Sequence, residues 1–597
     1  MPRPRRRSRK LNTRVCRVQP DVPAIHRAFD YALPDALARG VHVGTIVRVQ
    51  LHGRRVRGWV LDAGVVAPEV EGARLREVLA VVSAGPPPDV VDLCRWAAWR
   101  WAGPLARFLR AASPPNTVPA DVEPELETAM YPPASHTHGA LVVLAPADDA
   151  NAVVHSLVAS EGSTLVLDPD PARSARLAAE LTDHGREVIE LRSDRSPAEL
   201  SAAWDRARAG ACVAVGGRTA AWAPMPDLEA VIVVDEADES LEDERAPTWN
   251  AREVAVERSR RAGARVHMVT PAPTVDALVA LGEPEQRVRP RWPRVTVVDT
   301  RDEAPGQALL ASVLADELRR VRDSGGRSVC VLNRRGRARL LACRDCGELA
   351  RCELCGATVQ ERADGLICSR CDTVRPVVCL HCHGSRFRAV RPGVARVRDD
   401  LAALLPRASV AAVDATTTEV LDADVLIGTE AVLHRAPPGR PVGLVAFLEL
   451  DQELLAPRAR AAEQALWLLV RGARLLGPRE AGGVLLLQTR MPKHEVVVAA
   501  RDGEPLVVAD AERARRRALG WPPFGGAAEL SGEAVAVIAA CDALRGVDTV
   551  TVLGPVDNGK RALVRCTTVD ELCDALMNIE TAHALGRLRV DVDPRRA

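Results

Sequence analysis

Lysine is nearly absent from this sequence of 597 residues. It occurs only at positions 10, 493 and 560, so arginine supplies 77 of the 80 basic residues. No lysine lies between residues 11 and 492. Nucleotide-binding loops that use a lysine to neutralise phosphate charge are therefore excluded from most of the chain.

Long apolar runs are also missing. No stretch of about 18 uncharged apolar residues is present, so we expect no membrane span. The basic amino terminus MPRPRRRSRK is followed by the polar segment LNTR rather than an apolar stretch, so we expect no secretory signal and a cytoplasmic protein. Because the net charge is only +1, any binding of nucleic acid depends on local basic surfaces.

The pattern of apolar residues changes along the chain and indicates several domains, since single cores stop growing at about 250 to 300 residues. Alternating apolar residues predict a small β-rich domain, and two later sets of aliphatic runs separated by amphipathic helices are typical of parallel βα units. We predict an α/β fold with two tandem lobes. The boundaries are 1–110 for the N-terminal domain, 111–138 for a Pro-rich linker, 139–285 for lobe 1, 286–495 for lobe 2 with an insert at 343–382, and 496–597 for a small α+β domain.

The run VIVVDEADES, residues 231–240, predicts a buried strand that delivers Asp235 and Glu236 to its carboxyl end. ATP-driven motors place their magnesium-holding acids there. The loop that should bind phosphate, after the strand ALVVLAP, has Asp148 and Asp149 but no glycine, lysine or hydroxyl. Carboxylates repel a triphosphate, and capping of the next helix is sufficient to explain them. The phosphate-binding half of an ATPase site is therefore missing, and we expect no catalytic residues.

Eight of the fifteen cysteines lie in four Cys-x-x-Cys pairs. The pairs are Cys343/Cys346, Cys352/Cys355, Cys368/Cys371 and Cys379/Cys382. Each such turn supplies two corners of a tetrahedral zinc site, so eight sulfurs make two closed Zn²⁺ sites of a structural or partner-binding kind. An iron–sulfur cluster is the alternative, although its usual spacings differ. We expect His381 and His383 to be exposed bystanders.

Several motifs, in this order along the chain, resemble the primosomal protein N′ (PriA) family of replication restart helicases. They are FDYALPDALARGVHVGTIVRVQL, VLNRRGRARLLACRDCGELARCELCGATV with the later CLHC, DVLIGTE, and ERARRRALGWPPF. The resemblance implies an N-terminal domain that binds the 3′ end of the leading strand and two RecA-like helicase lobes of superfamily 2. It also implies a two-zinc insert and a C-terminal domain that binds DNA and primosome partners.

The resemblance also carries residue roles. It implies that Cys343, Cys346, Cys379 and Cys382 hold one zinc ion, and that Cys352, Cys355, Cys368 and Cys371 hold the other. It implies a pocket for the terminal nucleotide formed by Phe29, Asp30, Tyr31 and Gly53, in which an aromatic face stacks on a base and a carboxylate accepts from the 3′ hydroxyl. The family's winged-helix domain has no room in the Pro-rich linker.

The motor motifs of the family are altered here. Its linkage motif corresponds to TPAPT, residues 270–274. Arg471 and Arg474 lie near the arginine-finger segment, but alignment on Gly477 puts Gly472 and Leu475 at the finger positions. Asp235 and Glu236 are then retained at the end of their strand but no longer form a working nucleotide site.

Our hypothesis is a degenerate helicase that binds abandoned forks and DNA 3′ ends and helps to reload the replicative helicase without unwinding DNA. Primosome proteins, the replicative helicase and single-strand-binding protein are the partners it implies. The alternatives are an active ATP-dependent 3′ to 5′ DNA helicase and a zinc-ribbon adaptor that no longer binds DNA.

Overall fold

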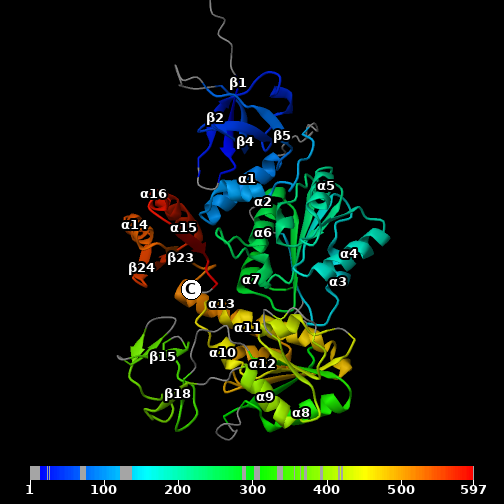
Figure 1. The fold of residues 1–597 in the computed structure, drawn as a ribbon, viewed down its shortest axis with the longest axis vertical. Coiled ribbons are helices and arrows are strands. Elements are labelled where there is room, and N and C mark those ends of the chain that lie inside the picture. The colour runs from blue at the N-terminus through cyan, green and yellow to red at the C-terminus, as the bar shows by residue number, and fades with distance from the viewer. Residues whose placement is uncertain are drawn as a thin grey trace, which may run out of the picture.

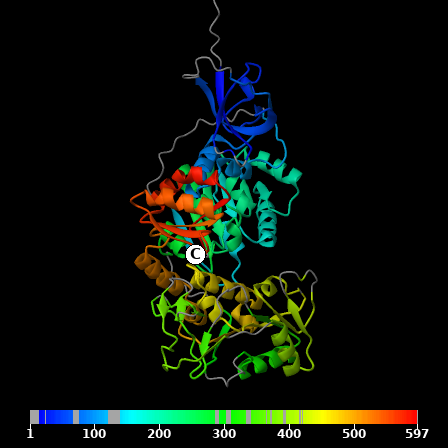
Figure 2. The same cartoon turned by 60° about the vertical axis from the view of Figure 1, so that its left-hand side comes forward.

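The computed structural model describes residues 14–22, 25, 27–66, 75–120, 138–284, 291–301, 309–332, 341–354, 356–362, 365–368, 373–389, 394–413, 417, 421–437 and 439–595. The N-terminal sheet lies at one end, the first lobe in the middle and the second lobe at the other end (Figure 1). The C-terminal sheet lies beside the first lobe, and the cysteine insert lies beside the second (Figures 1 and 2). Within these ranges no helix combines the length and the apolar character that a bilayer span requires.

The N-terminal segment forms an antiparallel sheet with strand order β2-β1-β4-β3-β5. Its strands are β1 (Arg14–Pro20), β2 (Phe29–Ala32), β3 (Ile46–Leu51), β4 (Arg54–Val66) and β5 (Ala80–Ser83). Helices α1 (Pro88–Arg100) and α2 (Leu105–Ala111) follow and pack against the first lobe. The β-rich segment read from the sequence is present, but β1 does not alternate strictly. Arg14 and Arg17 are exposed and Val15, Cys16 and Val18 are buried, and the pairing with β4 shifts register at Val15/Cys16 and Arg17/Val18.

The first lobe is a six-stranded parallel sheet with order β6-β11-β10-β7-β9-β8. Its strands are β6 (Gly139–Val143), β7 (Ser163–Leu167), β8 (Val188–Leu191), β9 (Val213–Gly216), β10 (Leu228–Val234) and β11 (Arg265–Thr270). Its helices are α3 (Ala150–Leu157), α4 (Pro171–Asp183), α5 (Pro197–Ala207), α6 (Ala251–Ala262) and α7 (Val275–Leu281). Helices flank both faces, so the strands are buried on both sides and read as continuous aliphatic runs.

The second lobe is also a six-stranded parallel sheet, with order β12-β22-β21-β13-β20-β19. Its strands are β12 (Arg294–Asp299), β13 (Arg327–Val331), β19 (Val410–Val413), β20 (Val425–Gly428), β21 (Val442–Phe447) and β22 (Val484–Thr489). Its helices are α8 (Ser312–Asp323), α9 (Val394–Leu404), α10 (Asp451–Leu454) and α11 (Ala461–Leu476). Helices α12 (Glu495–Asp502) and α13 (Leu506–Leu519) pack on α11, and α13 also contacts α7 of the first lobe.

The cysteine insert lies between β13 and α9, and its described residues form five short strands. They are β14 (Leu341–Cys343), β15 (Val359–Arg362), β16 (Gly365–Cys368), β17 (Val374–Arg375) and β18 (Phe387–Ala389). β14 pairs with β18, which brings the first and last Cys-x-x-Cys turns together. The insert is joined to the second lobe by Arg490, which donates to the carbonyl of Gly347.

The C-terminal segment forms a four-stranded antiparallel sheet with order β24-β25-β23-β26. Its strands are β23 (Gly526–Gly532), β24 (Thr551–Val556), β25 (Arg561–Cys566) and β26 (Leu588–Val592), and its helices are α14 (Ala534–Arg545), α15 (Val569–Leu576) and α16 (Glu580–His583). The architecture is therefore α/β, with two tandem lobes built on six-stranded parallel sheets, flanked by a β-rich N-terminal segment and an α+β C-terminal segment.

Candidate nucleotide, metal and DNA-end sites

Asp235 and Glu236 lie where the sequence predicts, at the carboxyl end of β10. Because β10 is parallel to β11 and β7, the ends of these strands meet at one edge of the sheet. Both side chains are buried, Asp235 at 2% exposure and Glu236 at 0%. Asp235 adopts φ of +53°, a left-handed conformation that is uncommon for a residue with a side chain.

Asp235 is neutralised by arginines from both lobes. Arg173 of α4 donates to it at 2.7 Å and also pairs with Asp168 at 2.6 Å. Arg474 of α11, in the second lobe, donates through both terminal nitrogens, at 2.6 and 2.8 Å. A carboxylate that is bound in this bidentate manner has its charge compensated by the protein itself.

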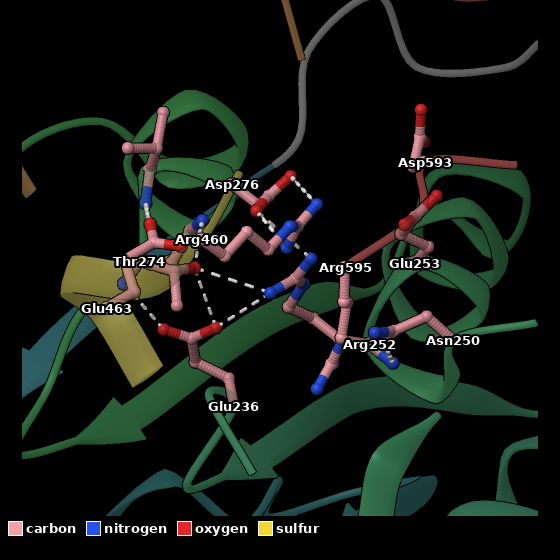
Figure 3. Close-up of polar contacts among 12 residues, drawn as sticks. Glu236, Asn250, Arg252, Glu253, Thr274, Asp276, Arg460, Glu463, Asp593 and Arg595 are labelled. Atoms are coloured by element: carbon pink, nitrogen blue, oxygen red, sulfur yellow. Dashed lines mark hydrogen bonds and ion pairs between the residues drawn. The ribbon is translucent and has the colours of Figure 1, made fainter. Parts of the chain in front are cut away.

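Glu236 is held entirely within the first lobe (Figure 3). Arg252 of α6 donates to its carboxylate at 3.0 Å, and Thr274 donates from its amide at 2.8 Å and from its hydroxyl at 2.9 Å. Complete burial raises the pKa of Glu236, while Arg252 and Thr274 act in the opposite direction. The TPAPT segment thus links the acid at the end of β10 to the start of α7.

In the loop after β6, the two acids form hydrogen bonds with nearby backbone amides. Asp148 accepts from the amide of Ala145 at 2.8 Å, and Asp149 accepts from Asn151 at 3.2 Å as the N-cap of α3. The capping interpretation therefore holds for Asp149, whereas Asp148 closes the loop in front of the helix. Arg474 donates to the carbonyl of Pro146 at 3.2 Å, so its guanidinium lies between this loop and Asp235.

A cavity of about 750 Å³ opens beside this edge. Its lining includes Asp238, Glu239, Glu242, Asp243 and Glu244, together with Arg218, Arg245, Arg471 and His434. Although burial acts in the opposite direction, Arg471 and Ser240 hold the pKa of Asp238 below its usual range. Because carboxylates dominate the wall, the cavity disfavours a triphosphate.

Four cysteines converge in the insert, as the interleaved arrangement requires. The sulfurs of Cys343, Cys346, Cys379 and Cys382 all lie within 4.8 Å of one another. Cys343 is 3.5 Å from Cys382, and Cys346 is 3.6 Å from Cys379. Two corners of a tetrahedron with zinc–sulfur bonds of about 2.3 Å are about 3.8 Å apart, so this donor set fits Zn²⁺.

The second cysteine set is described in part. Cys352 and Cys368 are buried, whereas Cys355 and Cys371 lie outside the described residues. The four pairs nevertheless share one backbone hydrogen bond, in which the amide of the first cysteine donates to the carbonyl five residues later. These bonds start at Cys343, Cys352, Cys368 and Cys379 and measure 2.8 to 2.9 Å. His381 and His383 are exposed, as expected.

The residues of the Phe-Asp-Tyr motif alternate across β2. Asp30 is exposed and accepts from Arg17 of β1 at 2.9 Å. The Phe29 ring is half-buried, with the guanidinium of Arg27 4.9 Å from its centre. Tyr31 points into the core at 3% exposure, and its hydroxyl donates to the carbonyl of Gln50 at 3.3 Å. Asp30 is thus the exposed member of the motif, and Phe29 is only partly accessible because it packs against the N-terminal core.

Gly53 lies in the two-residue turn between β3 and β4, where Leu51 pairs with Arg54. Both turn residues have positive φ, +44° at His52 and +82° at Gly53, which favours glycine at this position. β1 and β3 are each antiparallel to β4, so this turn and the connection from β1 to β2 leave the sheet at the same end. The exposed arginines at this end are Arg27, Arg54, Arg55 and Arg57.

Sequence reasoning missed the role of the arginines of α11 and α13. The sequence places Arg471 and Arg474 only near displaced finger positions, and it indicates no role for Arg516, which is buried within the family motif ERARRRALGWPPF. Their spacing is a partial signal, because Trp467, Arg471 and Arg474 recur at helical intervals and therefore share one face of the helix. In the structure both guanidinium groups lie over the Trp467 ring.

Comparisons with known proteins find relatives of this chain. A family model described as the 3'DNA-binding domain (3'BD) of PriA matches residues 17–114. The chain is 31% identical to a probable replication restart protein PriA of Mycobacterium tuberculosis, over 90% of each chain. It is 31% identical to replication restart protein PriA of Treponema pallidum over 62% of this chain and 60% of that one. Among solved structures, RecG bound to a three-way DNA junction aligns with a TM-score of 0.35 and 11% identity, covering 64% of this chain and 47% of that one.

Proposed function

The chain belongs to the family of PriA replication restart proteins, and from this premise we propose that it promotes replication restart without helicase activity of its own. In this proposal it binds abandoned or stalled forks through DNA 3′ ends and assists primosome assembly and reloading of the replicative helicase.

The observation that carries the proposal is the occupation of the nucleotide edge by protein groups. Asp235, the candidate magnesium-holding acid, is saturated by Arg173 and Arg474, and the adjoining loop has carboxylates where a motor needs glycines and a lysine. Binding of ATP would have to displace Arg474 and bring phosphates towards Asp148 and Asp149. This supports loss of the motor while other parts of the family pattern are retained.

Recognition of a 3′ end is supported by the exposed end of the N-terminal sheet. Phe29 offers an aromatic surface for a terminal base, and Asp30 offers a carboxylate for the 3′ hydroxyl. Tyr31 would support them from the core, and Gly53 allows the tight two-residue turn between β3 and β4 at the same end of the sheet. The exposed arginines at this end would attract DNA phosphates despite a net charge near zero.

Metal binding is proposed at two sites in the insert. Cys343, Cys346, Cys379 and Cys382 would hold one Zn²⁺, and Cys352, Cys355, Cys368 and Cys371 the other. Four thiolates close a zinc site, so both ions would shape the insert rather than perform chemistry. The insert would then present a fixed surface to primosome proteins, with single-strand-binding protein as a further candidate partner.

The domain limits are proposed as 1–110, 111–138, 139–285, 286–495 with the insert at 343–382, and 496–597. Within the last range, α13 packs on both lobes, so we propose that it connects the C-terminal sheet to the lobe interface.

Binding and hydrolysis measured on one preparation test this function. We expect tight binding to forks with a free 3′ end, loss of binding when that end is blocked, and no DNA-stimulated ATP hydrolysis. Turnover of about 1 per second or more that disappears in Asp235→Ala and Glu236→Ala would identify an active 3′ to 5′ helicase instead. Equal binding to both forks at low affinity would identify an adaptor that does not recognise DNA ends.

A further inference from the structure

Helix α11 of the second lobe presents two arginines to the first lobe. Arg474 binds Asp235, and Arg471 binds Asp238 at 3.0 Å and also contacts Glu430 of its own lobe. The guanidinium groups lie 5.6 Å (Arg471) and 5.1 Å (Arg474) from the centre of the Trp467 ring, which holds both in place. These contacts cross the lobe interface at the edge where a motor would bind ATP.

A second group of contacts crosses the interface around Asp276 (Figure 3). Arg460 of the second lobe donates to Asp276 at 2.7 Å, and Arg252 of the first lobe lies 3.4 Å from the same carboxylate. Glu463 of α11 accepts from the amide of Val275 at 2.8 Å. Arg516 of α13 contacts Glu463 and lies 3.6 Å from Asp276, so three parts of the chain meet here.

In a two-lobed motor the phosphates of ATP attract arginines of the second lobe and close the lobes on each other. Here carboxylates of the first lobe supply that negative charge permanently. The Asp235 side chain is 3% exposed, so removal of Arg474 would leave a buried carboxylate with less compensation, which is costly.

We propose that these contacts form a nucleotide-independent clamp that holds the two lobes closed, with Arg474 in the place that nucleotide would otherwise take. The clamp goes beyond the proposed role at forks, because it concerns the free protein. It makes the pair of lobes a rigid body on which the N-terminal sheet and the insert keep fixed positions.

The amide of Val275 is a local reporter of the clamp. Val275 is the first residue of α7, and a first-turn amide has no acceptor within its own helix. Its acceptor is Glu463 of the opposite lobe, so separation of the lobes exposes this amide to exchange with solvent. The amide of Ile232, in the centre of the first lobe's sheet, reports unfolding of the lobe itself.

Hydrogen exchange resolved to these two amides, on full-length protein without DNA, tests the clamp. We expect Arg474→Gln to accelerate exchange at Val275 about tenfold or more and to leave Ile232 unchanged. Asp235→Asn should also accelerate exchange at Val275. The double variant Asp235→Asn/Arg474→Gln should exchange only slightly faster than the faster single variant, because both changes break the same contact. Arg479→Gln, which removes the same charge from an exposed position of the second lobe, should change neither amide.

Magnesium ATP should leave exchange at Val275 in the unaltered protein unchanged. Slower exchange on addition of ATP, or unchanged exchange at Val275 in Arg474→Gln, would overturn the clamp. If Arg474→Gln also accelerates exchange at Ile232, the first lobe itself has unfolded. Arg471→Gln, which breaks the neighbouring contact with Asp238, then replaces it: faster exchange at Val275 with unchanged exchange at Ile232 supports the clamp, and unchanged exchange at Val275 overturns it. Because no DNA is present, failure of fork binding in a separate assay leaves this result intact.

Discussion

At the scale of single residues, Asp30 has the most specific expected role. It is exposed on β2 and shares Arg17 with Asp62, which lies opposite Arg17 on β4. A carboxylate that accepts from a 3′ hydroxyl contributes a charge-assisted hydrogen bond of about 1.5 to 3 kcal/mol. Asp30→Asn should therefore weaken binding to forks with a free 3′ end by about tenfold or more, as measured by fluorescence anisotropy.

The matched control for this prediction is Asp62→Asn, which removes the same charge beside the same arginine. It should leave the preference for a free 3′ end intact. An equal loss in both variants would indicate a general electrostatic effect around Arg17 and would refute hydroxyl recognition by Asp30.

Glu449 gives a pH-dependent prediction. Burial, together with the nearby Asp451, raises the pKa of this carboxyl to about 8 in the folded protein. In the unfolded chain the group ionises near its ordinary value of 4.5. The folded state therefore holds a proton that the unfolded state loses between these values, so stability falls as pH rises from about 4.5 to 8.

Removal of this charge should relieve the penalty. Glu449→Gln should raise the melting temperature relative to the unaltered protein at pH 8 to 9 and should have little effect near pH 5, as measured by calorimetry. Glu480→Gln, at an exposed position, should give a difference that does not depend on pH in this way. A constant difference for Glu449→Gln across the range would show that Glu449 is ionised in the folded protein.

At the scale of elements, the cysteine insert depends on its turns. Cys379→Ser removes one of four converging sulfurs, so we expect the zinc content to fall from about two ions to about one per chain, measured by elemental analysis. His383→Gly changes an exposed neighbour whose φ of +61° glycine adopts readily, and its zinc content should not change. Binding of 3′ ends should persist in Cys379→Ser, and its loss would contradict separate roles for the insert and the N-terminal sheet.

Elements with a strong periodic or spacing signal could be predicted from the sequence, and elements set by tertiary contacts could not. The runs around Val231 and Leu485 are aliphatic because their strands are buried on both faces, and the four Cys-x-x-Cys turns are local. The short strand β8 and the edge strand β12 give weaker sequence signals, because they mix polar and apolar residues. The pairing of Arg474 with Asp235 joins positions 239 residues apart, and no local pattern encodes such a contact.

At the scale of the whole molecule, the apolar cores do not follow the domain order along the sequence: three segments share one core, and the second lobe has its own. One continuous core includes Trp101 directly after α1, Val231 of the first lobe and Val564 of the C-terminal sheet. The main cores of the second lobe are separate and reach the first lobe at Ala272. We therefore expect two calorimetric transitions, one for the second lobe and one shared by the N-terminal helices, the first lobe and the C-terminal sheet.

Arg100 tests this division, because it joins the three parts that share a core. It is buried in α1, donates to Glu253 of the first lobe at 2.7 Å and also contacts Asp593 of the C-terminal segment. Arg100→Ala leaves two largely buried carboxylates without this partner, at a cost of about 3 to 5 kcal/mol. The shared transition should fall by roughly 3 °C or more, while the transition of the second lobe stays in place. Arg107→Ala, at an exposed position of α2, should move neither transition. A single transition that shifts as a whole in Arg100→Ala would mean that the clamp between the lobes makes the whole chain unfold as one unit.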